Sequence, residues 1–292
     1  MRVIRHVAEL QQLADSERSL GRRIGLVPTM GALHAGHLSM VEEARRRTDR
    51  VWLSIFVNPT QFNDPKDMDA YPSTFEDDLR ACREAGVDVV FAPGPDEMYD
   101  PDCQTWVDVD DITRPLCGAA RPGHFRGVIT IVTKLLLAAK PHVAVFGEKD
   151  FQQLAVIRRM VRDLGFDVEI VAGPIVREAD GLALSSRNVN LDAEARRQSL
   201  VLCQALDAAE RAVAAGETRT EALLQLVRQE IGKAPRAEID YAELRDSASL
   251  EAAPPELTRA TLLALAVFIR PPGAAAGTTV RLIDNRVLRP QQ

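Results

Sequence analysis

Ile24-Gly25-Leu26-Val27-Pro28-Thr29-Met30-Gly31-Ala32-Leu33-His34-Ala35-Gly36-His37 begins as a short apolar run and continues into a turn rich in proline and glycine. The apolar run is typical of a buried strand. Leu38, Val41 and Ala44 then recur at helical spacing, with charged residues on the opposite face. The stretch therefore predicts a strand, a tight turn and an amphipathic helix in succession, which is the first half of a βαβ unit.

The same alternation continues along the first 175 residues. Short apolar runs predict further strands, over residues 51–57, 87–91, 143–146 and 168–171. An amphipathic helix precedes the last of these runs, with Leu154, Ile157, Val161 and Leu164 on one face. Because strands that alternate with helices form parallel sheets, we expect an α/β, Rossmann-like N-terminal domain over residues 1–175.

A different pattern begins after Gly173-Pro174. Leu202, Leu206 and Val213 share one face of an expected helix, and a second helix is expected over residues 220–231. Apolar runs then follow at residues 239–244, 262–269 and 279–283. This succession predicts a smaller α+β C-terminal domain over residues 176–292, with helices and a short antiparallel sheet.

The composition excludes several classes of protein. The net charge of −6 and the pI of about 5.5 argue against broad nonspecific binding of nucleic acid, which requires a basic face. The N-terminus lacks the apolar run of a signal peptide, and the longest apolar stretches are shorter than the ~20 residues that span a bilayer. The four cysteines match no zinc spacing, so we expect thiols and a cytoplasmic location.

Two histidines, His34 and His37, lie on the turn after the first expected strand. Gly31 and Gly36 allow the backbone to approach a ligand closely, and the helix that follows turns its free N–H groups toward the same place. Imidazoles at that position can donate hydrogen bonds to phosphate oxygens and to charge that develops in a transition state. This turn therefore predicts a site for phosphate chemistry.

Three other polar segments adjoin expected strand ends or loops, and each is weaker evidence alone. Gln61 lies in a turn after the second expected strand, and its amide suits a hydroxyl or carboxylate ligand. Residues 147–150, with Gln153, join a strand to a helix and include Lys149, a point charge for phosphate. Residues 184–188 place two serines beside Arg187, which also suits phosphate oxygens.

The sequence leaves the role of one further stretch undecided and gives a second feature a purely structural explanation. Residues 121–128 combine two arginines, a histidine and two glycines, and either contact a ligand or shape a turn. Asp77 and Asp78 open a helix, where acidic residues are expected from the helix dipole alone.

Taken together, these segments resemble the pantoate–β-alanine ligase (pantothenate synthetase) family, which belongs to the His-x-Gly-His nucleotidyltransferase superfamily. The resemblance runs through residues 27–37, 56–62, 121–125, 146–153 and 177–188. The His-x-Gly-His element alone marks the whole superfamily, whereas the five segments in series are specific to the ligases. One departure is a turn near residues 270–279 that is longer than is usual in the family.

The resemblance implies ATP-dependent condensation of (R)-pantoate with β-alanine through a pantoyl adenylate, giving pantothenate, AMP and pyrophosphate. It implies Mg²⁺ with ATP, small-molecule partners without nucleic acid or membrane, a homodimer, and a C-terminal domain that forms a lid over the ATP site. The implied catalytic residues are His37, His34, Lys149 and Arg187. The implied ATP-binding residues are Met30, Gly31, Ala32, Leu33, His34, Ala35, Gly36, His37, Gly147, Glu148, Lys149, Asp150, Val176, Leu184, Ser185, Ser186 and Arg187. Gln61 and Gln153 are implied for pantoate, and Gln61 also for β-alanine; no residue is assigned to a metal.

Two alternatives remain beside this hypothesis. A nucleotidyltransferase with the same His-x-Gly-His site leaves AMP on its product instead of releasing it. A nucleotide-binding module without catalysis has no need for His37, Lys149 and Arg187 together.

Overall fold

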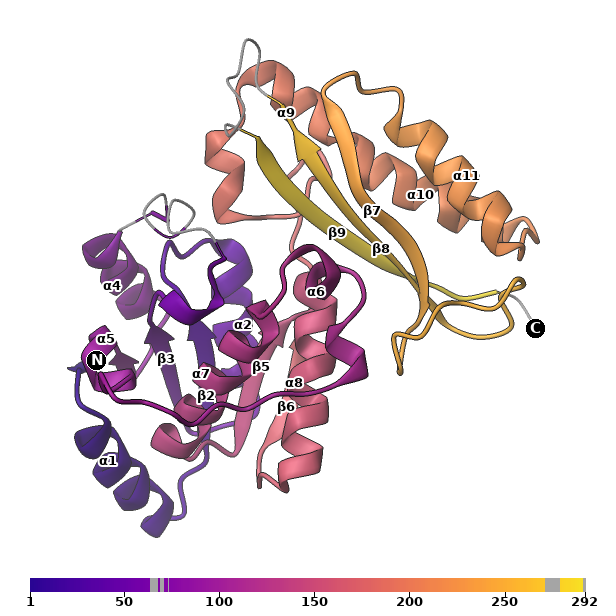
Figure 1. The fold of residues 1–292 in the computed structure, drawn as a ribbon. Coiled ribbons are helices and arrows are strands. Elements are labelled where there is room, and N and C mark those ends of the chain that lie inside the picture. Colours follow the sequence, from indigo (N-terminus) through magenta and orange to yellow (C-terminus); the bar gives the residue numbers. More distant parts are fainter. Residues whose placement is uncertain (64–67, 69–70, 73, 271–278, 291–292) are drawn as a thin grey trace. The chain divides into compact units, whose positions relative to one another are not determined.

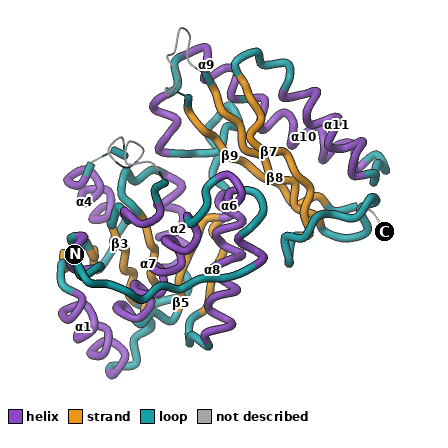
Figure 2. The backbone as a smooth tube through the Cα atoms, in the orientation of Figure 1, coloured by secondary structure: helices purple, strands orange, loops and turns teal. Residues whose placement is uncertain are grey.

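The computed structural model describes residues 1–63, 68, 71–72, 74–270 and 279–290. These described residues fall into two compact units, residues 1–148 with 153–175 and residues 149–152 with 176–292. Each unit is built around a sheet of its own (Figures 1 and 2). Most of the long turn expected near residues 270–279 lies outside the described residues.

Up to residue 175, helices alternate with strands along the chain (Figure 1). The elements are, in order, β1 (Arg2–Ile4), α1 (Val7–Ser19), β2 (Ile24–Thr29), α2 (Ala35–Arg45), β3 (Arg50–Ile55), the 3₁₀ helix η1 (Pro59–Gln61), α4 (Phe75–Glu84), β4 (Val89–Phe91), α5 (Pro95–Met98), η2 (Asp111–Thr113), α6 (Cys117–Ala120), α7 (His124–Ala139), β5 (Val143–Gly147), η3 (Glu148–Asp150), α8 (Phe151–Leu164) and β6 (Glu169–Gly173).

The strands of the first unit form one parallel sheet. Within the described residues the sheet has six strands, in the order β1-β4-β3-β2-β5-β6. The order changes direction at β2, because β3 and β4 follow on one side of it while β5 and β6 follow on the other. This arrangement confirms the expected α/β, Rossmann-like fold.

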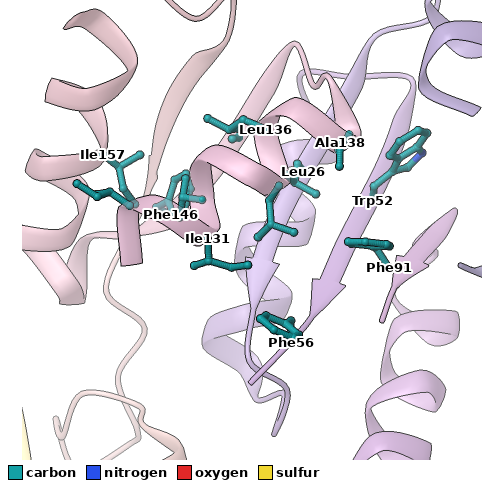
Figure 3. Packing of buried hydrophobic residues seen from close by; sticks show 14 of the residues in the cluster. Leu26, Trp52, Phe56, Phe91, Ile131, Leu136, Ala138, Phe146 and Ile157 are labelled. Atoms are coloured by element: carbon teal, nitrogen blue, oxygen red, sulfur yellow. The ribbon is translucent and has the colours of Figure 1, made fainter. Parts of the chain in front are cut away.

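Helices cover both faces of the parallel sheet, and the side chains of each strand alternate between two separate cores. Leu26, Trp52 and Phe146 pack on the face that carries α1, α7 and α8, where Ile131 and Leu136 of α7 meet them (Figure 3). The strand residues that alternate with them, Val27, Leu53 and Val145, pack on the other face against Val41 of α2 and Leu79 of α4. Burial on both faces explains why these strands have continuous apolar sequences.

Three details of the first unit differ from the sequence expectations or were absent from them. The strand expected over residues 51–57 ends at Ile55, because the chain then turns toward η1. The apolar run 128–131 lies inside the buried helix α7. β1 and α1 precede the strand that was expected to come first; β1 has only three residues, too few to show a periodic pattern.

The second unit places helices on one face of an antiparallel sheet (Figure 1). Its elements are η4 (Ser186–Asn190), α9 (Ala193–Ser199), α10 (Val201–Ala214), α11 (Thr220–Ile231), β7 (Ala237–Asp246), β8 (Thr261–Ile269) and β9 (Val280–Leu288). Within the described residues the sheet has three strands, in the order β7-β8-β9. Alternate residues of β8, such as Leu263 and Leu265, pack against Leu206 and Val227 of the helices. The expected α+β architecture is therefore confirmed.

Candidate active site

The candidate residues of the first unit follow the carboxyl ends of neighbouring parallel strands. Thr29, the last residue of β2, pairs with Ile55, the last residue of β3. Residues 30–34 and 56–61 extend from these two ends, and Gly147 closes β5 on the other side of β2. Ligands of open α/β sheets bind where the strand order changes direction. In this sheet the carboxyl ends of β2 and β5 mark that place.

The turn after β2 has an unusual backbone. Gly31 has a φ of 88° and Ala32 a φ of 51°, so both occupy the left-handed region. A Cβ on residue 31 would lie 3.0 Å from Asp78 Oδ2 and 3.2 Å from Ile55 Cγ2, and the positive φ would strain any other residue at this position. In this conformation the backbone N–H groups of Ala32 and Leu33 donate to Asp78 Oδ2 and Oδ1, at 2.9 and 2.8 Å.

Asp78 is therefore part of the site's framework, and the expectation that it serves only the helix dipole was wrong. Its side chain is buried, and Oδ2 also accepts from Thr74 Oγ1 at 3.2 Å. The sequence carried a signal for this role. Asp78 lies on the face of α4 formed by Phe75, Leu79 and Cys82, which is turned toward the core. Asp77 instead points to solvent and pairs with Arg80.

His34 and His37 form a hydrogen-bonded pair at the start of α2. His34 is the N-cap residue, and its Nδ1 accepts from the N–H of Gly36 at 3.1 Å. His37 Nδ1 accepts from the N–H of His34 at 3.3 Å, and the two ring centroids are 4.1 Å apart. Because Nδ1 of each ring acts as an acceptor, the hydrogen of each neutral imidazole is on Nε2. Both rings are thus fixed in the tautomer that can donate to a phosphate oxygen through Nε2.

Gln61 is held beside Met30 by a buried asparagine. Gln61 Nε2 donates to Met30 Sδ at 3.0 Å, and Asn58 Nδ2 donates to Gln61 Oε1 at 3.1 Å. Asn58 is almost fully buried, and its Oδ1 accepts from Thr60 Oγ1 and from the Tyr99 hydroxyl, at 3.0 and 2.9 Å. Burial raises the pKa of Tyr99, so this donor keeps its hydrogen over a wide pH range. Asn58 was not among the candidate residues, because nothing in its local sequence marks it as buried.

The stretch 121–128, which the sequence left undecided, supports the backbone of Gln61. His124 Nδ1 lies 2.8 Å from the carbonyl oxygen of Gln61, and Arg121 Nη2 donates to the same oxygen at 3.3 Å. The carbonyl of Gly127 accepts from Asn58 Nδ2 at 3.2 Å. The start of α7 therefore acts as a platform for the turn that carries Gln61.

Gly127→Ala is expected to disturb this platform, although alanine normally favours a helix. A Cβ at residue 127 would lie 2.3 Å from the carbonyl oxygen of Thr60 and 2.8 Å from the backbone nitrogen of Gln61. We expect a loss of about 1–3 kcal/mol in unfolding free energy, measured in urea. Gly94→Ala is the matched control, because a Cβ there meets nothing within 4 Å. An unchanged stability of Gly127→Ala would contradict the close approach of α7 to the turn.

The segment after β5 carries the next group of candidates. Gly147 ends the strand, Glu148 to Asp150 form the 3₁₀ helix η3, and Gln153 is half-buried in the first turn of α8. Gly147, Glu148 and Gln153 belong to the first unit with residues 30–37 and Gln61, whereas Lys149 and Asp150 belong to the second.

The remaining candidates lie in a folded loop of the second unit. The N–H of Leu184 donates to the carbonyl of Val176 at 3.0 Å, which closes the base of the loop. Ser185 caps η4 by accepting from the N–H of Arg187 at 3.2 Å, and the Arg187 side chain is exposed. The loop therefore has a fixed base and a cationic residue open to solvent.

A network that sequence reasoning missed holds this loop. Asn188 Nδ2 donates to Glu178 Oε1 at 2.8 Å, and Arg196 donates to both Glu178 oxygens at 2.8 Å. The hydrogen bonds from Arg196, and then that from Asn188, hold the pKa of Glu178 below its usual value. Glu178 therefore keeps its charge at neutral pH and anchors the residue that follows Arg187.

Neither a metal cluster nor a membrane-spanning helix is found in the described part of the chain. Among those residues, no three His, Cys, Asp or Glu side chains gather closely enough to hold a metal ion. Likewise, no helix there has the length and apolar character needed to cross a bilayer.

Comparison with known proteins identifies the family. The model of the family described as pantoate-beta-alanine ligase matches residues 2–287. The chain belongs to this family. Among its relatives, the pantothenate synthetase of Syntrophobacter fumaroxidans is 51% identical over 290 residues, 99% of each chain. The pantothenate synthetase of Geobacter sulfurreducens is 51% identical over 293 residues, 100% of each chain.

Solved structures of the family have the same fold. The pantothenate synthetase of Thermus thermophilus has a TM-score of 0.90 and 43% identity, covering 99% of this chain and 100% of that one. A pantoate-beta-alanine ligase of Francisella tularensis, described as complexed with "Beta-gamma ATP and Beta-alanine", has a TM-score of 0.79 and 32% identity, covering 98% of this chain and 97% of that one. As a member of the family, the chain is a ligase that joins pantoate to β-alanine to form pantothenate.

Proposed function

We propose that the ligation consumes ATP and proceeds through an enzyme-bound pantoyl adenylate. The observation that carries this proposal is the pair of imidazoles at the start of α2, each with its Nδ1 accepting a backbone N–H and its hydrogen on Nε2. Two fixed donors at a helix N-terminus suit an anionic phosphate group. The Francisella relative, described in complex with a form of ATP and with β-alanine, supports the same choice of substrates.

The chemistry follows from the poor reactivity of a carboxylate. A pantoate carboxylate oxygen attacks the α-phosphorus of ATP, a P–O bond forms, and pyrophosphate leaves with the electrons of the broken P–O bond. The β-alanine amine then attacks the acyl carbon, AMP leaves with the bridging oxygen, and the amine loses a proton. Phosphoryl-type transfer depends mainly on positioning and charge stabilisation, so no covalent bond to the protein is required.

We propose the following roles within this scheme. His34 and His37 donate to phosphate oxygens as charge moves in the transition state, while Lys149 and Arg187 neutralise phosphate charge. Gln61 and Gln153 hold pantoate, and Gln61 also lies near β-alanine. The residues proposed to bind ATP are Met30, Gly31, Ala32, Leu33, His34, Ala35, Gly36, His37, Gly147, Glu148, Lys149, Asp150, Val176, Leu184, Ser185, Ser186 and Arg187.

The proposal also covers the metal ion, the roles of the two parts of the chain, and the oligomeric state and location of the protein. Mg²⁺ enters as the ATP complex, held by phosphate oxygens and water. Residues 1–175 bind pantoate and much of the nucleotide, and residues 176–292 act as a lid that supplies the serine–arginine loop. We also propose a homodimer that works in the cytoplasm, where cysteines remain reduced.

Product analysis tests the proposal. The chain is incubated with ATP, Mg²⁺, pantoate and β-alanine, and AMP, pyrophosphate and pantothenate are measured. We expect equal amounts of the three, with free AMP accumulating only when β-alanine is present. A stable AMP-containing product in the complete mixture would favour a nucleotidyltransferase instead. Release of ADP and phosphate would contradict the adenylate route.

Gln61→Ala is expected to impair the use of pantoate while leaving ATP affinity nearly intact. The amide of Gln61 sits between Asn58 and Met30 and still has a second N–H and a second lone pair for a ligand. We expect the pantoate KM to rise about tenfold or more, with a change of less than about threefold in the ATP Kd. Gln12→Ala, on the exposed side of α1, is the control. Equal losses for both ligands would contradict the role of Gln61 in pantoate binding.

A further inference from the structure

Strand β9 contains two adjacent buried polar residues, Asp284 and Asn285, which are 2% and 6% exposed. Neighbouring side chains of a strand point to opposite faces of a sheet. Asn285 is buried even though Ile283 and Val287, on the same face of β9, are only half-buried. Another part of the chain must therefore cover the sheet at Asn285, and a buried amide requires a hydrogen-bond partner there.

The backbone of Lys149 provides a hydrogen-bond partner for Asn285. Asn285 Nδ2 donates to the carbonyl oxygen of Lys149 at 2.9 Å. Residues 149–152 belong to the second compact unit, although the residues before and after them in the sequence belong to the first. This hydrogen bond thus links the four-residue segment to the sheet of the unit with which it packs.

Asp284 holds β9 in place at this point. Its carboxylate accepts two hydrogen bonds from the guanidinium of Arg177, at 2.6 and 2.9 Å, and one from the N–H of Asn285 at 2.8 Å. Arg177 Nη1 also donates to the carbonyl of Gly181 at 3.0 Å. A two-point arginine–carboxylate pair fixes direction as well as distance. The backbone from which the Asn285 amide extends is therefore rigidly placed.

We propose that Asn285 is a positioning residue for Lys149. Lys149 has a long flexible side chain, so the orientation of its peptide group decides where its ammonium group can reach. By fixing the Lys149 carbonyl, Asn285 directs this ammonium group to the phosphates of ATP. The inference rests on the proposed role of Lys149 in ATP binding. It means that the C-terminal sheet helps to position Lys149.

A double-mutant cycle tests the inference, because an effect that acts through Lys149 disappears when Lys149 is removed. The wild type, Asn285→Ala, Lys149→Ala and the double variant are compared by kcat/KM for ATP, measured with radiolabelled ATP over several decades of rate. We expect Asn285→Ala to lower kcat/KM about tenfold or more in the wild-type background. In the Lys149→Ala background the same change should cost less than about threefold.

Arg286→Gln is the matched control on the same strand. Arg286 pairs with Asp207 and Glu210 of α10 at 2.6 Å and has no hydrogen bond to residues 149–152 or 177–181 among the described contacts. It should leave kcat/KM for ATP unchanged. Thermal unfolding of every variant shows whether the fold is intact, and Asn285→Ser replaces Asn285→Ala in the cycle if the alanine variant does not fold.

The outcomes distinguish the proposed role of Lys149 in ATP binding from the proposed role of Asn285 in positioning Lys149. A normal kcat/KM in Lys149→Ala contradicts the proposed role of Lys149, and with it the inference. A large loss in Lys149→Ala together with an additive double variant leaves the role of Lys149 standing and overturns the role of Asn285. A loss in Arg286→Gln equal to that in Asn285→Ala also overturns it, because the effect then belongs to the strand in general.

Discussion

Replacing His37 with alanine is expected to slow adenylate formation by about 10²- to 10³-fold while changing the ATP Kd by less than about threefold. The ring of His37 is fixed by its Nδ1 contact with the N–H of His34, which leaves the hydrogen on Nε2. A donor held in this way stabilises charge that is larger in the transition state than in bound ATP. The measurement is a single-turnover assay of pyrophosphate release with pantoate present and β-alanine absent.

The effect on catalysis must be separated from an effect on folding. His37→Ala also removes a cap from α2, which costs about 0.5–2 kcal/mol of stability, so thermal unfolding is measured alongside the rate. His6→Ala is the control for the loss of a histidine side chain at the start of a helix outside the candidate site. His6 occupies the N-cap position of α1 and makes no cap hydrogen bond there. Near-wild-type adenylation by folded His37→Ala would refute the proposed role of this histidine.

Asp78→Asn is expected to produce the second large loss, although Asp78 need not touch a substrate. The carboxylate accepts from the N–H groups of Ala32 and Leu33 through different oxygens, and an amide can replace only one of these acceptors. The other N–H would face an NH₂ group, which destabilises the fold by about 1–3 kcal/mol. Because Gly31 and Ala32 are held at positive φ, the turn is expected to relax and shift the two histidines.

We expect single-turnover adenylation by folded Asp78→Asn to fall about 10- to 100-fold, with Asp77→Asn as the matched control. The Asp77 side chain is 72% exposed and pairs with Arg80, so its replacement should change neither rate nor stability appreciably. If Asp78→Asn loses stability but keeps the full adenylation rate, the contacts of Asp78 serve only folding.

Much of the fold follows from local patterns in the sequence. The run 24–27 and the helical spacing of Leu38, Val41 and Ala44 are visible within residues 24–44, and β2 and α2 form there. Hydrophobic periodicity records which side of an element is buried, and that is sufficient to predict a parallel sheet covered by helices. The second unit was predictable for the same reason, because α11 carries apolar residues at helical spacing and β8 is a continuous apolar run.

The framework of the site was harder to predict, because its contacts join distant parts of the sequence. Asp78 meets Ala32 across 46 residues, Asn58 meets Gly127 across 69, and Asn285 meets Lys149 across 136. Local sequence can place a polar residue on the buried face of a helix, as it does for Asp78. It does not identify the residue with which that side chain forms hydrogen bonds. Motifs therefore indicated the residues that we propose to face ligands, whereas the residues that hold them in place became visible only in the folded chain.

The most direct test of the adenylate route follows the oxygen atoms of pantoate. Pantoate labelled with ¹⁸O at both carboxylate positions is converted with ATP, Mg²⁺ and β-alanine, and the products are analysed by mass spectrometry. If the carboxylate attacks the α-phosphorus, each AMP carries one ¹⁸O atom and each pantothenate keeps the other in its new amide. Appearance of the label in inorganic phosphate, or unlabelled AMP with label lost to water, would contradict a pantoyl adenylate.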